Sequence, residues 1–406
     1  MDSEPRKQKP RWQLRILLIT LKLTMLTIAL IAIMFLYARN NIIKRYSPYY
    51  DICTFSFEKV FSVYAVVIDQ EASYEGVVWS VRNWDFREIE VSEAQYFKNT
   101  QKRFSLSFST KNLTSIPQKI FDLKRLRSLD LSNNEIRSIP KEIGKLQELE
   151  YLNLSYNRLR SLPEEIYQLK KLQTLSLGNN PLISVSEKIG SLQDLIFLNL
   201  DKTNISNIPQ QIAKLKKLIT LYVSSSQLKH FSLAILELKS LVNLSFSDSS
   251  IESIPKEIIQ LQNLKSLCFE NNSLTFLPEN LGKLPNLEEL FLAKNLLHNL
   301  PSSCTKFKRL FRLDLSKNQF KQFPLEITKI TEIDILELGN NQLKSIPIEL
   351  KKVQIDYLFL NNNQLKELPK ELAESNIISL DFKNNLASRE QQIKIESLFP
   401  KISIEF

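Results

Sequence analysis

One repeating pattern of 22 or 23 residues runs from Arg103 to Asn376 and constrains the fold more than any other feature of the chain. It is clearest in residues 126–148, LRSLDLSNNEIRSIPKEIGKLQE. When each unit is numbered from its first leucine, apolar residues recur at positions 1, 4, 6, 11, 14, 18 and 21, with asparagine usual at 9 and proline at 15. Eleven units begin at residues 126, 149, 172, 195, 218, 241, 264, 287, 310, 333 and 355, after a weaker first copy at 103 and before a broken last strand at 377.

The spacing of these apolar positions predicts the structure of one unit. Positions 4 and 6 have the period of a strand, whereas positions 18 and 21 have the period of a helix. Each unit therefore predicts a short strand, a turn and a helical return. Because a single unit cannot bury its apolar side alone, neighbouring units must stack into one continuous core. The repeat overrides the two or three domains that 406 residues would otherwise suggest.

The pattern LxxLxLxxNxLxxLPxxIxxLxx resembles the leucine-rich repeat family over about 285 residues. In detail it is similar to the 23-residue class found in Ras-suppressor and Scribble-type proteins, plant Ras-group proteins and many bacterial proteins. The resemblance implies an α/β fold, a right-handed leucine-rich repeat solenoid with a curved parallel sheet on its concave face and short helices on its convex face. It also implies protein recognition as the function.

The asparagines at position 9 are predicted to be structural. A buried amide there pairs with backbone groups of adjacent coils that would otherwise lack partners. Proline at position 15, present in ten of the twelve units, suits the first turn of a helix, where its missing N–H costs nothing. The predicted asparagine ladder consists of Asn134, Asn157, Asn180, Asn272, Asn295, Asn318, Asn341 and Asn363.

An apolar run ahead of the repeats, residues 16–37, is long enough to cross a bilayer as a helix. Its one charge, Lys22, costs about 3 kcal/mol, whereas its Leu, Ile and Phe residues together return about 4 to 8 kcal/mol. An uncleaved signal-anchor is therefore favoured over a cleaved signal peptide with an apolar core at residues 23–37. Five basic residues in the tail at 1–15, against three soon after the run, predict a cytoplasmic tail and repeats on the periplasmic or extracellular side.

The repeats are flanked by two regions that we interpret as caps. Residues 38–102 are rich in aromatics, and runs at 60–68, 76–82 and 87–91 predict a hairpin and a third strand. They would cover the exposed first coil, with a small binding domain as the alternative. Residues 388–406 form the second predicted cap, with a closing helix over 388–398.

Catalytic chemistry is not predicted. The two histidines, His230 and His298, lie three units apart, so they cannot share a metal ion. Five of the six glycines fall at repeat positions 7 and 19, which leaves no glycine-rich phosphate loop. No nucleophile, base and orienting residue stand out from the repeat. We therefore expect neither enzymatic activity nor a cofactor or metal.

Basic doublets close many of the units and contribute to the net charge of +10. They predict a basic ridge along the outer rim, which we interpret as a solvated face. Nucleic acid is not expected as a partner, because no recognised nucleic-acid module or aromatic platform accompanies the ridge. The doublets lie at residues 124–125, 170–171, 216–217, 308–309 and 351–352.

The expected binding surface lies at positions 3, 5 and 7, whose side chains should point out from the concave face of the sheet. Aromatic residues there are the usual anchors of protein interfaces. Acids outnumber bases at these positions, so a basic or mixed-charge protein is the expected partner. The candidate partner-binding residues are Tyr151, Phe197, Asp201, Tyr222, Asn243, Glu289, Phe291, Arg312, Asp314, Ile335, Tyr357 and Phe359. The plain alternative is that the aromatics only pack on one another across strands.

Between the two groups of aromatics, the fifth to seventh units replace the ladder asparagine with Thr203, Ser226 and Ser249. The surrounding serines suggest either sequence drift with a looser coil, or a polar floor that binds a glycan or peptide with Tyr222 and Asn243. The sequence therefore predicts a membrane-anchored, non-catalytic protein that recognises another protein. A carbohydrate-binding or adhesive protein and a cytosol-facing signalling scaffold are the alternatives.

Overall fold

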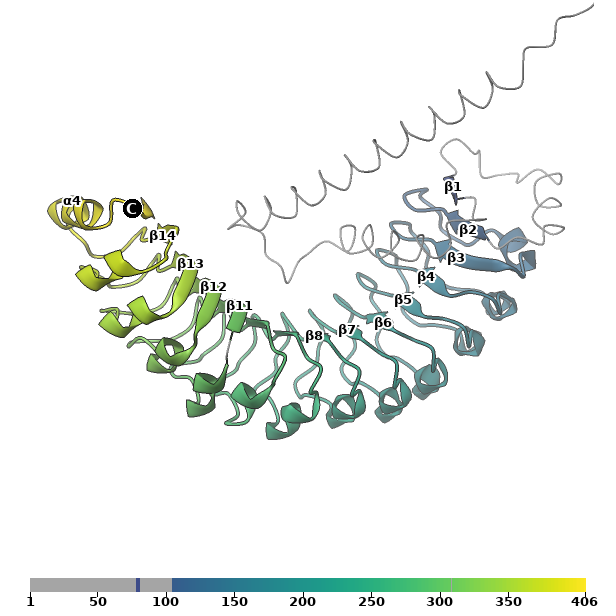
Figure 1. The fold of residues 1–406 in the computed structure, drawn as a ribbon. Helices are drawn as coiled ribbons and strands as arrows, with labels where there is room; N and C mark the ends of the chain where they lie inside the picture. Colours follow the sequence, from purple (N-terminus) through teal and green to yellow (C-terminus); the bar gives the residue numbers. More distant parts are fainter. Residues whose placement is uncertain (1–77, 81–103, 308) are drawn as a thin grey trace, which may run out of the picture. The chain divides into compact units, whose positions relative to one another are not determined.

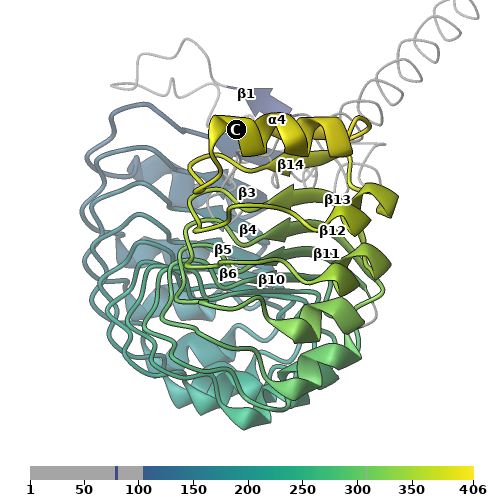
Figure 2. The same cartoon turned by 90° about the vertical axis from the view of Figure 1, so that its left-hand side faces the viewer.

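A computed structural model describes residues 78–80, 104–307 and 309–406, all within one compact unit, Val67–Phe406. The described residues form one parallel sheet of fifteen strands in sequence order, along the inner side of a curved stack of coils (Figures 1 and 2). The strands are β1 (Val78–Ser80), β2 (Phe104–Ser107), β3 (Leu126–Asp130), β4 (Tyr151–Asn153), β5 (Thr174–Ser176), β6 (Phe197–Asn199), β7 (Thr220–Tyr222), β8 (Asn243–Ser245), β9 (Ser266–Cys268), β10 (Glu289–Phe291), β11 (Arg309–Asp314), β12 (Glu332–Glu337), β13 (Gln354–Phe359), β14 (Ser379–Asp381) and β15 (Ser403–Glu405).

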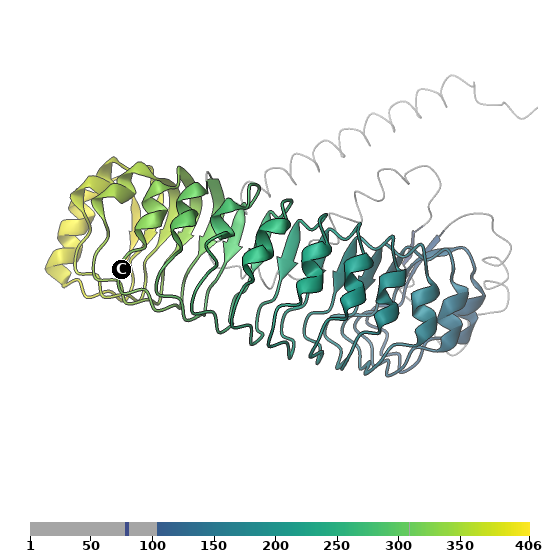
Figure 3. The ribbon, with the colours of Figure 1, turned by 90° about the horizontal axis from the view of Figure 1, so that it is seen from below.

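Short helices line the convex side of the stack (Figure 3). They are 3-10 helices rather than α-helices, because each return holds only one turn before the next strand. They are η2 (Gln118–Asp122), η3 (Lys141–Lys145), η4 (Glu164–Gln168), η5 (Glu187–Ser191), η6 (Gln210–Lys214), η7 (Leu233–Glu237), η8 (Lys256–Gln260), η9 (Leu281–Lys283), η10 (Ser302–Lys306), η11 (Leu325–Lys329), η12 (Ile348–Lys352) and η13 (Lys370–Glu374). The one described α-helix is α4 (Arg389–Leu398).

In nine of the twelve described 3-10 helices the proline at position 15 is the N-cap residue, just before the helix rather than in its first turn. Pro140 has the extended backbone of an N-cap residue, with φ −72° and ψ 154°. Its carbonyl accepts the N–H of Ile143 at 3.1 Å, which closes the 3-10 turn. The placement expected from the sequence was therefore wrong by one residue. The proline fixes the entry into the helix and still loses no backbone hydrogen bond.

The asparagine at position 9 ties two adjacent coils together. In Asn157 the side-chain oxygen accepts the N–H of Ile136 at 3.0 Å, and the amide nitrogen donates to the carbonyls of Leu131 at 2.9 Å and Leu154 at 3.0 Å. The residue just before it has a positive φ, 55° at Tyr156, and this left-handed turn recurs at position 8 of the units. The ladder also includes Asn385 in the coil of β14, which the sequence analysis did not identify.

The sheet continues through the units that lack the ladder asparagine. Strands β6 to β9 pair in one unbroken register, Phe197 with Thr220, Thr220 with Asn243, and so on. Buried phenylalanines stack here across the coils, with ring centroids 5.3 Å apart for Phe231 and Phe246 and 5.4 Å apart for Phe246 and Phe269. Aromatic packing thus supports the part of the core in which the amide bonds are missing.

Both ends of the described sheet carry an added strand. Strand β1, which lies within the strand predicted at 76–82, pairs in parallel with β2. At the other end, α4 begins at a capping box formed by Ser388 and Gln391, and β15 pairs with β14. The predicted membrane span at 16–37 and the predicted strands at 60–68 and 87–91 lie outside the described residues. No helix in the described ranges has the length and apolar character needed to cross a bilayer.

Candidate functional site

The concave sheet places positions 3 and 5 of successive units in two parallel rows. In the first row Tyr151 of β4 pairs with Thr174 of β5, which pairs with Phe197 of β6. In the second row Phe291 of β10 pairs with Asp314 of β11. Between the rows the leucines at position 4 are fully buried. Positions 3 and 5 thus form two rows on the concave face of the described sheet.

Position 7 does not belong to this surface, contrary to the expectation from the sequence. Ser132, Ser155 and Ser247 are almost fully buried at this position. A Cβ atom added at Gly178 would lie 2.9 Å from the side-chain oxygen of Asn199 in the next coil. The chain already turns out of the strand here, so the side chain meets the adjacent coil. Most units therefore hold Ser, Gly or Ala at position 7 for steric reasons, while Asp201, Glu270 and Asn361 are the larger residues found there.

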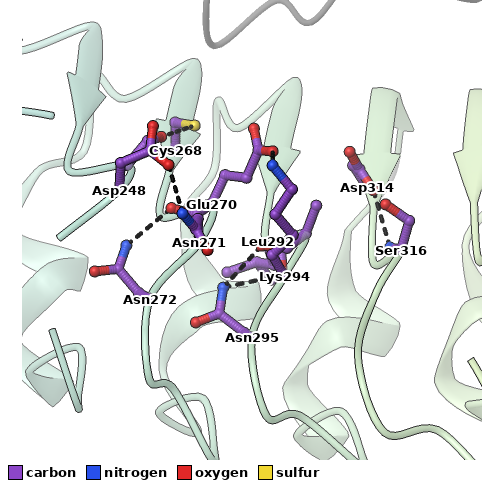
Figure 4. Close-up of polar contacts among 12 residues, drawn as sticks. Asp248, Cys268, Glu270, Asn271, Asn272, Leu292, Lys294, Asn295, Asp314 and Ser316 are labelled. Carbon is purple, nitrogen blue, oxygen red and sulfur yellow. Dashed lines mark hydrogen bonds and ion pairs between the residues drawn. The ribbon is translucent and has the colours of Figure 1, made fainter. Parts of the chain in front are cut away.

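Polar residues at position 5 have a structural role that the sequence analysis missed. The side-chain oxygen of Asp314 accepts the N–H of Ser316 at 2.9 Å (Figure 4), and Asp130 does the same with Ser132 at 3.0 Å. Each of these side chains closes an Asx turn at the end of its strand. The signal in the sequence was the recurrence of Asp or Asn at position 5. The same contact is made by Asn153, Asn199 and Asp381.

The first group of aromatics is only partly brought together. Phe197 and Tyr222 meet edge to face, with ring centroids 5.8 Å apart and an interplanar angle of 88°. Tyr151 lies two strands away from Phe197, with Thr174 between them. All three aromatic side chains are half-buried. The Phe197–Tyr222 pair is therefore the compact aromatic feature of the amino-terminal half of the sheet.

The second group is organised around Arg312 rather than around a continuous apolar patch. The guanidinium of Arg312 lies 5.3 Å from the ring centroid of Phe291 and contacts the carboxylate of Glu337 at 2.5 and 2.7 Å. Phe291 is only 3% exposed and Arg312 only 8%, so the prediction that both are exposed was wrong. Ile335 and Tyr357 pair directly between β12 and β13, where Glu337 also pairs with Phe359.

In the polar floor predicted from the sequence, serine hydroxyl groups make hydrogen bonds within the protein. Ser224 and Ser245 are 2.7 Å apart at their oxygens, and the oxygen of Ser247 lies 2.8 Å from the sulfur of Cys268. The amide of Asn243 donates to the hydroxyl of Thr220 at 3.1 Å. Ser224, Ser245 and Ser247 are nearly fully buried. These three hydroxyl groups are therefore not offered to a glycan.

Burial also changes the acid–base behaviour of two neighbouring residues. Desolvation raises the pKa of Asp201 to about 6, although its carboxylate accepts the N–H of Ser224 at 2.6 Å. Desolvation, reinforced by the negative charges of Asp201 and Glu289, raises the pKa of Tyr222 to about 12. Tyr222 therefore stays a neutral hydrogen-bond donor at physiological pH.

Many of the remaining charges are matched across coils. Glu270 pairs with Lys294 at 3.3 Å (Figure 4). The predicted basic ridge is likewise interrupted by acids, because Lys171 pairs with Glu148 at 2.6 Å and Lys217 pairs with Asp194 at 2.7 Å. The doublet at 308–309 lies outside the residues whose side chains are described. Among the side chains that the structure describes, no three His, Cys, Asp or Glu residues are arranged to hold a metal ion.

The fold and the repeat are those of a known family. A model described as leucine-rich repeat matches residues 102–159 and 124–182, and one described as leucine-rich repeat region matches residues 184–269. A solved leucine-rich repeat protein of Leptospira interrogans is 30% identical with a TM-score of 0.61, over 78% of this chain and 98% of that one. The chain belongs to the leucine-rich repeat family. No curated protein sequence matches it.

Plant receptors are also similar in structure. The ectodomain of the Arabidopsis thaliana receptor kinase GASSHO1/SCHENGEN3, solved with CASPARIAN STRIP INTEGRITY FACTOR 2, is 28% identical with a TM-score of 0.63, over 74% of this chain. The plant peptide hormone receptor RGFR1, solved with RGF2, is 30% identical with a TM-score of 0.59, over 75% of this chain. The present chain spans only 38% and 50% of those two proteins.

Proposed function

We propose that this protein is a non-catalytic, membrane-anchored leucine-rich repeat protein that recognises another protein through its concave sheet. The observation that carries the proposal is the pair of half-buried aromatics, Phe197 and Tyr222, at strand positions that the core does not require to be aromatic. Equivalent positions in neighbouring units hold threonine, asparagine and serine. Rigid aromatic side chains are typical anchors of protein interfaces. The similar plant receptors, solved in complex with CASPARIAN STRIP INTEGRITY FACTOR 2 and with RGF2, support recognition of a partner by this fold.

The test compares partner capture by three forms of the full chain after cross-linking in its native membrane. One form is the wild type, and one carries Phe197→Ser with Tyr222→Ser. The control carries Leu325→Ser with Ile348→Ser, which removes two exposed apolar residues from the convex side. Circular dichroism verifies that all three forms are folded. We expect a protein partner that the wild type and the convex control retain and the concave variant loses.

Equal recovery by the wild type and the concave variant would refute recognition through this part of the sheet. A carbohydrate-binding or adhesive role is the second candidate suggested by the sequence. The internal hydrogen bonds of Ser224, Ser245 and Ser247 disfavour it, because those hydroxyl groups already have partners. A cytosol-facing scaffold would bind in the same way and differs in topology alone.

A further inference from the structure

Charge is distributed unevenly along the concave sheet. In the units of β4 to β9, positions 2, 3 and 5 carry only two charged residues, Glu150 and Lys265. In the units of β10 to β13 the same positions carry six acids and a single base, Arg312. The acids are Glu288, Glu289, Asp314, Asp334, Glu337 and Asp356. The carboxy-terminal half of the sheet is therefore acidic in a chain whose net charge is +10.

The same region is also the widest part of the sheet. Strands β11, β12 and β13 each have six residues, whereas β4 to β10 have three. At position 21, one or two residues before each long strand, Phe307, Ile330 and Val353 replace leucine, and their backbone is extended with ψ between 126° and 137°. β-branched and aromatic residues favour extended backbone. The three long strands begin early in their units and take in Phe311, Asp334 and Asp356.

Apolar side chains lie among these acids. Ile335 of β12 pairs with Tyr357 of β13, and Glu337 pairs with Phe359. All four of these side chains, and those of Asp334 and Asp356, are half-buried. A surface that alternates aromatic rings with carboxylates suits a partner that alternates cationic and apolar residues. It disfavours nucleic acid, whose phosphates it would repel.

We propose that the face formed by β10 to β13 docks a segment of a partner protein in which lysine or arginine alternates with apolar residues. This inference rests on the proposed function and specifies the chemistry of the partner. Glu288 is paired with Lys265 at 2.8 Å, so the carboxylates of Asp334 and Asp356 at position 2 receive the cations. Ile335, Tyr357 and Phe359 contact the apolar residues. Arg312 neutralises Glu337 and keeps this acid from repelling its neighbours. Electrostatic attraction accelerates the encounter and excludes acidic partners.

The probe is a fluorescently labelled peptide of repeated Lys-Leu-Ser units, with a Gln-Leu-Ser peptide as its uncharged counterpart. Binding to the full chain is measured by fluorescence anisotropy. The test variant carries Asp334→Asn and Asp356→Asn. The matched control carries Glu349→Gln and Glu367→Gln, two exposed acids on η12 and on the return of the next unit. Both variants change the net charge by the same amount, so non-specific attraction affects them equally.

We expect the test variant to bind the lysine peptide roughly five-fold more weakly than wild type, and the control to differ by less than about two-fold. Higher salt should weaken wild-type binding, and the uncharged peptide should bind poorly. Equal losses in the two variants, or no binding by wild type, would overturn the proposal. If a captured protein is lost with Phe197→Ser and Tyr222→Ser but kept with the two asparagine substitutions, the recognition function stands and the basic-partner inference fails.

Discussion

At the residue scale, one asparagine side chain in each ladder unit makes hydrogen bonds to several buried backbone groups. Asn318 accepts the N–H of Leu297 at 3.0 Å and donates to the carbonyls of Leu292 at 2.9 Å and Leu315 at 3.1 Å. These groups belong to two coils and lie away from water, so no solvent could replace the amide. The repeat keeps asparagine at this position because no other uncharged side chain of this size both donates two hydrogen bonds and accepts one.

We predict that Asn318→Ala lowers the free energy of unfolding by about 2 to 4 kcal/mol, because it leaves buried backbone groups without partners. Urea denaturation followed by circular dichroism measures the change. Asn376→Ala, at an exposed asparagine, is the control and should change the value by less than about 0.5 kcal/mol. Similar values for the two variants would contradict the structural role of the ladder.

Asp201 gives a pH-dependent prediction. Burial raises its pKa to about 6, so the folded chain binds this proton more tightly than the unfolded chain, and the free energy of unfolding falls as pH rises from about 4 to about 6. Asp201→Asn removes this dependence and preserves an acceptor for the N–H of Ser224. The free energy of unfolding of the variant minus that of wild type should be roughly 1 to 3 kcal/mol larger at pH 7 than at pH 4. Urea denaturation at the two pH values tests this. A constant difference would show that Asp201 does not titrate in this range.

At the element scale, the stacking of the convex helices sets which side chains each helix tolerates. Position 19 faces the next coil, and the clearance there varies along the stack. A Cβ atom added at Gly282 in η9 would lie 1.9 Å from the backbone carbonyl oxygen of Ser303 in η10, whereas one added at Gly144 in η3 would meet the side chain of Glu165 at 3.0 Å. The short η9, of three residues, accompanies the tight approach.

Gly282→Ala is predicted to destabilise the chain by about 1 to 3 kcal/mol, because backbone rather than a flexible side chain must move. Gly144→Ala is the matched control, in the same kind of helix, and should cost less than about 1 kcal/mol, since its nearest atom, the Cβ of Glu165, lies 3.0 Å away and needs to move by only a few tenths of an ångström. Thermal unfolding midpoints of the two variants give the comparison. A larger effect at Gly144 would mean that clearance between helices does not control this position.

At the scale of the whole molecule, ion pairs between neighbouring coils neutralise part of the charge of the described solenoid. Several lysines that the sequence gathers at the ends of units are partnered by acids one coil away, as in Lys351 with Glu374 at 2.7 Å. Acids therefore interrupt the predicted basic ridge in the described part of the chain. What distinguishes one region from another is the concave sheet, with a nearly uncharged amino-terminal half and an acidic carboxy-terminal half.

Membrane topology is the prediction that concerns the entire chain. If residues 16–37 form an uncleaved anchor with a cytoplasmic tail, the repeats lie on the other side of the membrane. In sealed vesicles with the cytoplasmic face outward, we expect added protease to leave the repeats intact until detergent is added. An epitope at the amino terminus should be lost without detergent. Digestion of the repeats in sealed vesicles would instead support the cytosol-facing scaffold.

The period of the sequence by itself determined the coil, the parallel sheet, the buried leucines and the asparagine ladder, because these depend on contacts that every unit makes with an identical neighbour. Only the tertiary structure decided how each exposed position is used. In the structure, the side chain at position 7 meets the next coil. Asp314 closes an Asx turn, and Phe291 lies beneath Arg312. Such roles depend on the side chains that adjacent coils place beside one another, and a pattern within a single unit carries no information about that pairing.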